Sequence, residues 1–147
     1  MSRSMNKHPI LILSASLGIV LLNGLIGHYL PLSLVLILFS PSFATFNMLD
    51  GLSDINPLWR GFLTFLLASL SDVGLRFYGY GIIDHEGLDW YNSFLFFGLI
   101  PTFGLLLLSV LPDKKVTMIM KFAGIAIFLV MIFGYLHFFS DLGVGKA

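Results

Sequence analysis

The 147-residue chain contains no cysteine, and only 11% of its residues are charged. Without cysteine the chain has no disulfide, no thiolate ligand for zinc and no thiol nucleophile. A soluble domain carries about 25% charged residues, so this composition excludes an ordinary soluble globular protein. The eight basic and eight acidic side chains cancel, and no basic excess is available to bind nucleic acid.

Apolar residues are abundant instead. They make up 57% of the chain and include 15 phenylalanines, and the mean hydropathy is +0.94. The surface of such an apolar chain is more stable against lipid than against water. The composition therefore indicates an integral membrane protein, with the lipid bilayer as an expected partner.

Five apolar stretches have the length of about 20 residues that a membrane-spanning helix requires. They predict one all-α transmembrane domain over residues 1–147, a small bundle of five helices. Asn56-Pro57 marks a turn before the third span, and Pro112 ends the fourth, with Asp113 as an expected cap of the fifth. The predicted spans cover residues 9–30, 31–49, 60–78, 91–111 and 116–139.

The second stretch is the weakest of the five because Pro41 lies in its middle. Four spans plus a re-entrant segment are the alternative. Basic residues collect in cytoplasmic loops, and five spans with a cytoplasmic N-terminus place six of the eight basic residues on that side. If the second stretch did not cross, Lys114, Lys115 and Lys121 would fall outside, so five spans fit better.

The aromatic residues agree with this topology. Tyrosine and tryptophan favour membrane interfaces because the ring is apolar and its tip is polar. Five spans place Trp59 near the inner interface and the following residues toward the outer one: Tyr29, Tyr78, Tyr80, Trp90, Tyr91 and Tyr135.

Asp72 and Arg76 are ionisable residues within the third span. They are four residues apart and share one helix face, where they can pair. The pattern fits an ion pair that fixes helix register, a proton or ion pathway, or contact with a lipid head group or partner. Small residues on the same stripe predict a face for helix packing: Gly61, Thr64, Ala68 and Ser71.

A second group of ionisable residues is expected at the outer face. The loop after the third span carries Asp84, His85, Glu86 and Asp89. The five-span topology adds residues from the ends of spans one and five: His28, His137 and Asp141. Carboxylate and imidazole groups can ligate a divalent metal or perform acid–base catalysis, but no spacing matches a metal motif. The main expectation is therefore a solvated loop with Asp89 capping the fourth span, and metal binding or acid–base catalysis is the alternative.

Other polar or small residues predict helix packing. Ser16 and Asn23 lie on one face of the first span, where a neighbouring helix is expected. Pro41 and Pro101 lie near the middle of spans two and four, and each bends its helix or frames a cleft. Gly18 and Gly124 offer close-approach surfaces for a partner or for a neighbouring helix.

These features predict a small multi-pass membrane protein, with the inner membrane of a bacterium as the expected location. The main hypothesis is a non-catalytic subunit or accessory component of a homo- or hetero-oligomeric membrane complex. One alternative is a transporter or ion-pathway component that uses Asp72 and Arg76. Another is a membrane enzyme that acts at the outer interface through Asp84, His85 and Glu86.

Overall fold

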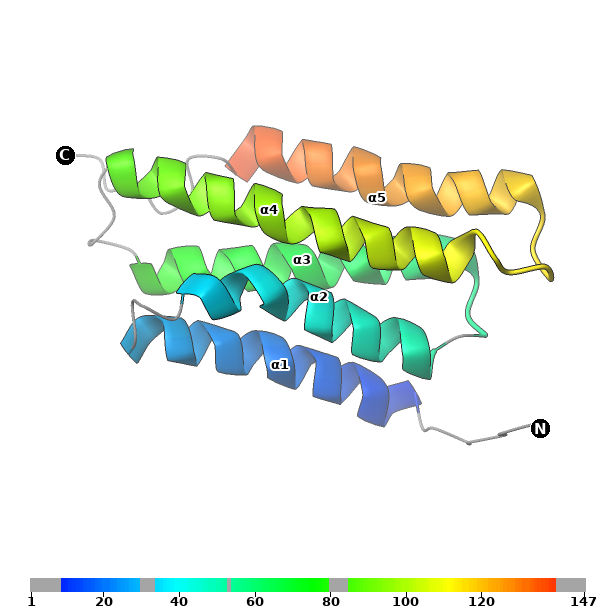
Figure 1. Ribbon diagram of the computed structural model, residues 1–147, viewed down its shortest axis with the longest axis horizontal. Coiled ribbons are helices and arrows are strands. Elements are labelled where there is room, and N and C mark those ends of the chain that lie inside the picture. Colours follow the sequence, from blue (N-terminus) through cyan, green and yellow to red (C-terminus); the bar gives the residue numbers. More distant parts are fainter. Residues whose placement is uncertain (1–8, 30–33, 53, 80–84, 140–147) are drawn as a thin grey trace.

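In a computed structural model the chain folds into five α-helices (Figure 1). The structure describes residues 9–29, 34–52, 54–79 and 85–139, and no strand occurs within them. The expectation of an all-helical chain with five helices is confirmed. The helices are α1 (Pro9–Tyr29), α2 (Leu34–Gly51), α3 (Pro57–Gly79), α4 (His85–Val110) and α5 (Met118–Phe139).

Local sequence explains several helix ends. α3 begins at Pro57, where a missing N–H costs nothing, and the Asn56 side chain accepts a hydrogen bond from the Leu58 N–H at 3.0 Å. Pro41 and Pro101 lie inside α2 and α4, and both helices continue through them. α4 begins at His85 rather than near residue 91, so the expectation that Asp89 caps this helix is wrong.

The helices alternate in direction along the bundle (Figure 1). α3 lies at the centre and contacts each of the other four helices. α1 and α5 pack on either side of α3 in one layer, and α2 and α4 pack against each other in a second layer. The alternation brings the first residues of α1, α3 and α5 to one end, together with residues 51–52, 54–56 and 111–117 (Figure 1). We call this the Arg60 end, and the opposite one the His137 end.

Two apolar clusters lie on the two sides of α3. The first joins α1, α2 and α3 through residues such as Ile12, Met48 and Leu67. The second joins α3, α4 and α5 through residues such as Leu106 and Phe128. Because α3 contributes to both clusters, it connects the two halves of the bundle.

The backbones of α3 and α5 approach each other closely at two glycines. A Cβ atom added to Gly61 would overlap the carbonyl group of Gly124, and one added to Gly124 would lie 2.7 Å from the carbonyl carbon of Pro57. Thr64 and Ala68 of α3 are fully buried along the same face. The predicted packing face of the third helix is therefore confirmed, and α5 is the helix that packs on it.

One helix in the described ranges, α5, is by itself long and apolar enough to cross a membrane. Two shorter apolar helical stretches cover Pro9–Leu22 and Leu95–Val110. One such helix is weak evidence for membrane association.

Candidate functional site

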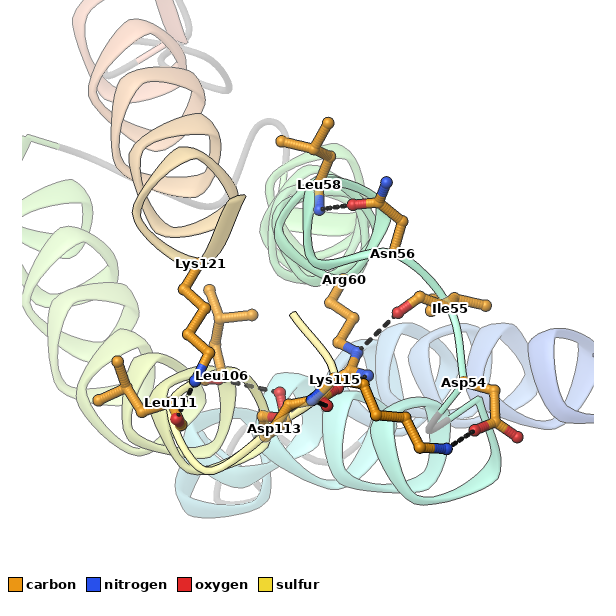
Figure 2. A network of polar contacts seen from close by, with 11 residues as sticks. Asp54, Ile55, Asn56, Leu58, Arg60, Leu106, Leu111, Asp113, Lys115 and Lys121 are labelled. Carbon is orange, nitrogen blue, oxygen red and sulfur yellow. Dashed lines mark hydrogen bonds and ion pairs between the residues drawn. The ribbon is translucent and has the colours of Figure 1, made fainter. Parts of the chain in front are cut away.

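The Arg60 side chain is the most connected polar group at its end of the bundle (Figure 2). It is 3% exposed and extends from the first turns of α3. Its Nε donates to the Ile55 carbonyl at 3.0 Å, and Nη1 donates to the Ser109 carbonyl at 2.5 Å. Its Nη2 donates to Asp113 Oδ2 at 2.9 Å. One guanidinium thus joins the α2–α3 connection, the end of α4 and the α4–α5 connection.

Asp113 completes the anionic side of this network. Its Oδ1 accepts a hydrogen bond from the Lys115 backbone N–H at 3.1 Å, so it stabilises the turn after α4. This hydrogen bond, together with Arg60, holds the pKa of Asp113 below its ordinary value, although partial desolvation acts in the opposite direction. The carboxylate is therefore ionised at neutral pH. The expectation that Asp113 caps the fifth helix is wrong, because α5 begins only at Met118.

Lys121 is a second buried cation at the same end. It is 7% exposed, and its Nζ donates to the Leu111 carbonyl at 2.6 Å. The last carbonyls of a helix have no partner within the helix and carry partial negative charge. Arg60 extends from α3 and Lys121 from α5, and both donate hydrogen bonds to carbonyls at the end of α4 (Figure 2). Two buried cations therefore stabilise that helix terminus.

A cavity of about 740 Å³ opens beside the Arg60 network. Its polar lining includes Asp50, Asp54 and Lys115, and its apolar lining includes Phe46 and Leu108. Lys115 Nζ lies 3.9 Å from Asp54 Oδ1, and both side chains are almost fully exposed, so this ion pair stabilises the fold little. Within the described ranges no group of three His, Asp or Glu residues could hold a metal ion.

Asp72 lies deep between α3 and α5. It is 3% exposed, and the Tyr135 hydroxyl donates to its Oδ2 at 2.5 Å. The Tyr135 ring contacts Phe65 edge-on and stacks on Phe139. Tyr135 is therefore buried against α3, four residues before the end of α5, and its expected place toward the outer interface stays a prediction.

Replacing Tyr135 with phenylalanine keeps the ring contacts and removes only the hydroxyl that donates a hydrogen bond to Asp72. A hydrogen bond to a carboxylate contributes about 1.5–3 kcal/mol, so we expect Tyr135→Phe to lower the free energy of unfolding by about 2 kcal/mol. Circular dichroism during titration with a denaturing detergent measures this. Phe133→Leu is the control because Phe133 is 72% exposed on the same helix. Equal unfolding of Tyr135→Phe and wild type would contradict a stabilising role.

Two further polar contacts lie between helices in the interior. Ser42 and Thr102, each next to a helix proline, form a hydrogen bond of 3.0 Å between α2 and α4. The Asn47 side chain donates to Ser16 Oγ at 2.9 Å and joins α2 to α1. The predicted role of Ser16 in helix packing is confirmed. Four buried hydroxyl groups in the described ranges have no hydrogen-bond partner: those of Ser40, Thr45, Thr64 and Ser71.

The backbone brings much of the expected outer group to the His137 end. The last residues of α1, the first of α4 and the last of α5 lie at this end (Figure 1), but in the described residues α1 contacts neither α4 nor α5. His85, Glu86 and Asp89 lie in the first two turns of α4, and His137 is exposed near the end of α5. Asp84 and Asp141 lie outside the described residues, as do the side chains of His28, His85, Glu86, Asp89 and Arg76. The metal, enzyme and ion-pathway alternatives therefore stay predictions.

The Arg60 network was not expected from the sequence. Arg60 and Lys121 are predicted there as basic residues facing the cytoplasm, but both are buried. One available clue was that each charge lies in the first turns of an apolar helix, where it must find a partner. Comparison of the chain with protein-family models, with curated proteins and with solved structures finds no match.

Proposed function

We propose that this chain is a five-span integral membrane protein that acts as a non-catalytic subunit of a membrane complex. One observation carries the proposal: the surface is apolar, whereas much of the interior is polar. Phe43, Phe133 and Ile119 are more than 60% exposed, while Arg60, Asp72 and Thr64 are at most 3% exposed. Large exposed apolar patches are rare on soluble monomers and are ordinary where lipid is the solvent.

Helix length supports the same proposal. The helices contain between 18 and 26 residues, which corresponds to about 27–39 Å at a rise of 1.5 Å per residue. The hydrocarbon core of a bilayer is about 30 Å thick. Five alternating helices of this length match five crossings.

Charge supports an orientation in which the Arg60 end faces the cytoplasm. Arg60, Lys114, Lys115 and Lys121 lie at this end of the described chain, and Arg3 and Lys7 precede α1 in the sequence. Cytoplasmic segments carry the excess of basic residues.

The subunit role is supported by how the described charged residues are used. Arg60, Lys121 and Asp72 each bind a neighbouring helix or connection, which fits a structural role. The outer face of α2 presents Phe39, Phe43 and Phe46, which are exposed and spaced by four and three residues. A stripe with this spacing suits a partner transmembrane helix.

Cysteine labelling tests the topology, because the native chain has no cysteine. We expect Gly87→Cys to react with a membrane-impermeant maleimide in intact cells, and Val116→Cys to react only after the membrane is opened. Labelling of both sites after opening is the control for reactivity. The reverse pattern in intact cells, or loss of the protein from membranes washed with carbonate, would contradict the proposed topology.

A photo-crosslinking phenylalanine analogue tests the subunit role. Placed at Phe43, it is expected to give one protein adduct of defined mass in native membranes. The same analogue at Phe122, which is 61% exposed on α5, is the control site. Adducts with lipid alone at both positions would contradict a partner on the α2 face.

A further inference from the structure

Two of the helices in the described ranges contain a proline in their interior, and these two helices pack against each other. α2 contains Pro41 and α4 contains Pro101, whereas Pro9 and Pro57 are the first residues of α1 and α3. A proline inside a helix has no N–H to donate, and its ring crowds the carbonyl four residues earlier. Each of the two helices is therefore least resistant to bending at its proline.

The two prolines lie at the same level of the bundle. Each is followed directly by a hydroxyl residue, and the side chains of these residues, Ser42 and Thr102, form a hydrogen bond of 3.0 Å. Thr102 also donates to the Gly98 carbonyl at 2.8 Å, so Ser42 is the donor in the bond between the helices. Because α2 and α4 run in the same direction (Figure 1), their two bending points lie side by side and are joined by this bond.

Polar contacts hold the parts of both helices that follow the prolines. The Asn47 side chain of α2 donates to Ser16 of α1 at 2.9 Å. Arg60 of α3 and Lys121 of α5 donate to carbonyls at the end of α4. The parts of α2 and α4 at the Arg60 end are thereby fixed to the other three helices.

The parts that precede the prolines extend to the His137 end, and we call them the arms of α2 and α4. The arm of α4 covers residues 85–100, which corresponds to about 24 Å at a rise of 1.5 Å per residue. α4 packs mainly on α2 and less on α3 and α5. A small bend at Pro101 therefore produces a large displacement of the first turns of α4, which include His85 and Asp89.

We propose that Pro41 and Pro101 form one hinge, at which the arms of α2 and α4 bend together relative to α1, α3 and α5. The hydrogen bond between Ser42 and Thr102 couples the two helices. The motion changes the distance between the first turn of α4 and the last turn of α5, so it controls access to the His137 end of the bundle. The hinge follows from contacts within the chain and does not depend on the proposed membrane topology.

Spin labels measure the hinge directly, because the native chain has no cysteine. One pair of labels, at Phe97→Cys and Phe133→Cys, joins the arm of α4 to α5. A matched pair, at Leu108→Cys and Ile119→Cys, joins the fixed part of α4 to α5. All these side chains are at least 60% exposed. In the full-length chain in detergent, we expect pulsed electron–electron double resonance to give a broader distance distribution for the first pair than for the second.

Replacing the proline tests the cause of the motion. Pro101→Ala restores the N–H that the helix lacks, and we expect it to narrow the distribution of the Phe97–Phe133 pair to the width of the matched pair. Pro9→Ala is the control, because Pro9 is the first residue of α1, where a missing N–H costs nothing. A broad distribution that persists in Pro101→Ala would overturn the hinge, as would equal widths for the two pairs in the native background.

A third pair of labels tests whether the two helices bend together. Phe39→Cys and Phe97→Cys join the arms of α2 and α4 to each other, and both side chains are exposed. A concerted hinge predicts a narrow distribution for this pair, which Ser42→Ala is expected to broaden because it removes the hydrogen bond between the helices. A broad distribution before that change would overturn concerted bending. An unchanged distribution in Ser42→Ala would overturn the coupling through this bond.

Discussion

Replacing Gly124 with leucine is expected to separate α3 from α5 and to lower the free energy of unfolding by at least about 3 kcal/mol. The reason is the absence of space: a Cβ atom at this position already meets the carbonyl of Pro57, which belongs to the backbone and cannot rotate away. Denaturing-detergent titration followed by circular dichroism measures the loss. Gly124→Ala is expected to lower the free energy of unfolding as well, but by less than Gly124→Leu does.

Gly134→Ala is the matched control on the same helix, because a Cβ atom there would meet nothing within 4 Å. Gly18→Leu on α1 is a second control with equally open space around the Cβ. If Gly124→Ala and Gly134→Ala unfold alike, the close contact between α3 and α5 is not what stabilises the pair. Gly124 thus tests folding rather than partner binding, whereas Gly18 remains open for a partner.

Replacing Arg60 with methionine is expected to destabilise the protein by about 3 kcal/mol, because two backbone carbonyls lose a charged hydrogen-bond donor. The methionine fills similar volume but leaves the Ile55 and Ser109 carbonyls without the donor that each now has. It also leaves the Asp113 carboxylate, whose side chain is 18% exposed, without its cation. The same unfolding titration measures the effect, and proteolysis of the α4–α5 connection reports whether that turn loosens.

Two variants test whether geometry or charge matters at Arg60. Arg60→Lys keeps the charge but cannot present a planar fork to several acceptors, so most of the loss is expected to remain. Lys115→Met removes only the exposed ion pair with Asp54, and its expected cost is below about 1 kcal/mol. Full stability of Arg60→Lys would mean that charge alone is sufficient.

The helices were predictable because long apolar stretches and their punctuation are local features. The expected spans 9–30 and 116–139 match α1 and α5 to within two residues. α4 was placed too late because the charges of His85, Glu86 and Asp89 resemble a loop, yet these residues are helical. A polar helix end that extends beyond an apolar stretch cannot be detected from hydropathy.

The contacts of the site were less predictable because they join distant parts of the chain. The pairing of Asp72 with Tyr135 spans 63 residues, and that of Arg60 with Asp113 spans 53. The sequence identified Asp72 as a costly buried charge, but it could not name the partner before the packing of α3 against α5 was known. Gly61 and Gly124 are the sequence features that could have indicated this packing, since glycines on two facing helices allow their backbones to approach closely.

The central position of α3 has a consequence for how the protein is made. α3 is the least apolar of the five helices, and it carries both Arg60 and Asp72, yet it contacts every other helix. In the proposed five-span topology, α3 with its two buried charges is a poor substrate for membrane insertion by itself. We expect α3 to reach its final position only after α4 and α5 have been synthesised, because Ser109, Asp113 and Tyr135 are then available to bind Arg60 and Asp72. Ribosome-bound chains that stop before residue 109 should therefore hold α3 less firmly in the membrane than longer ones.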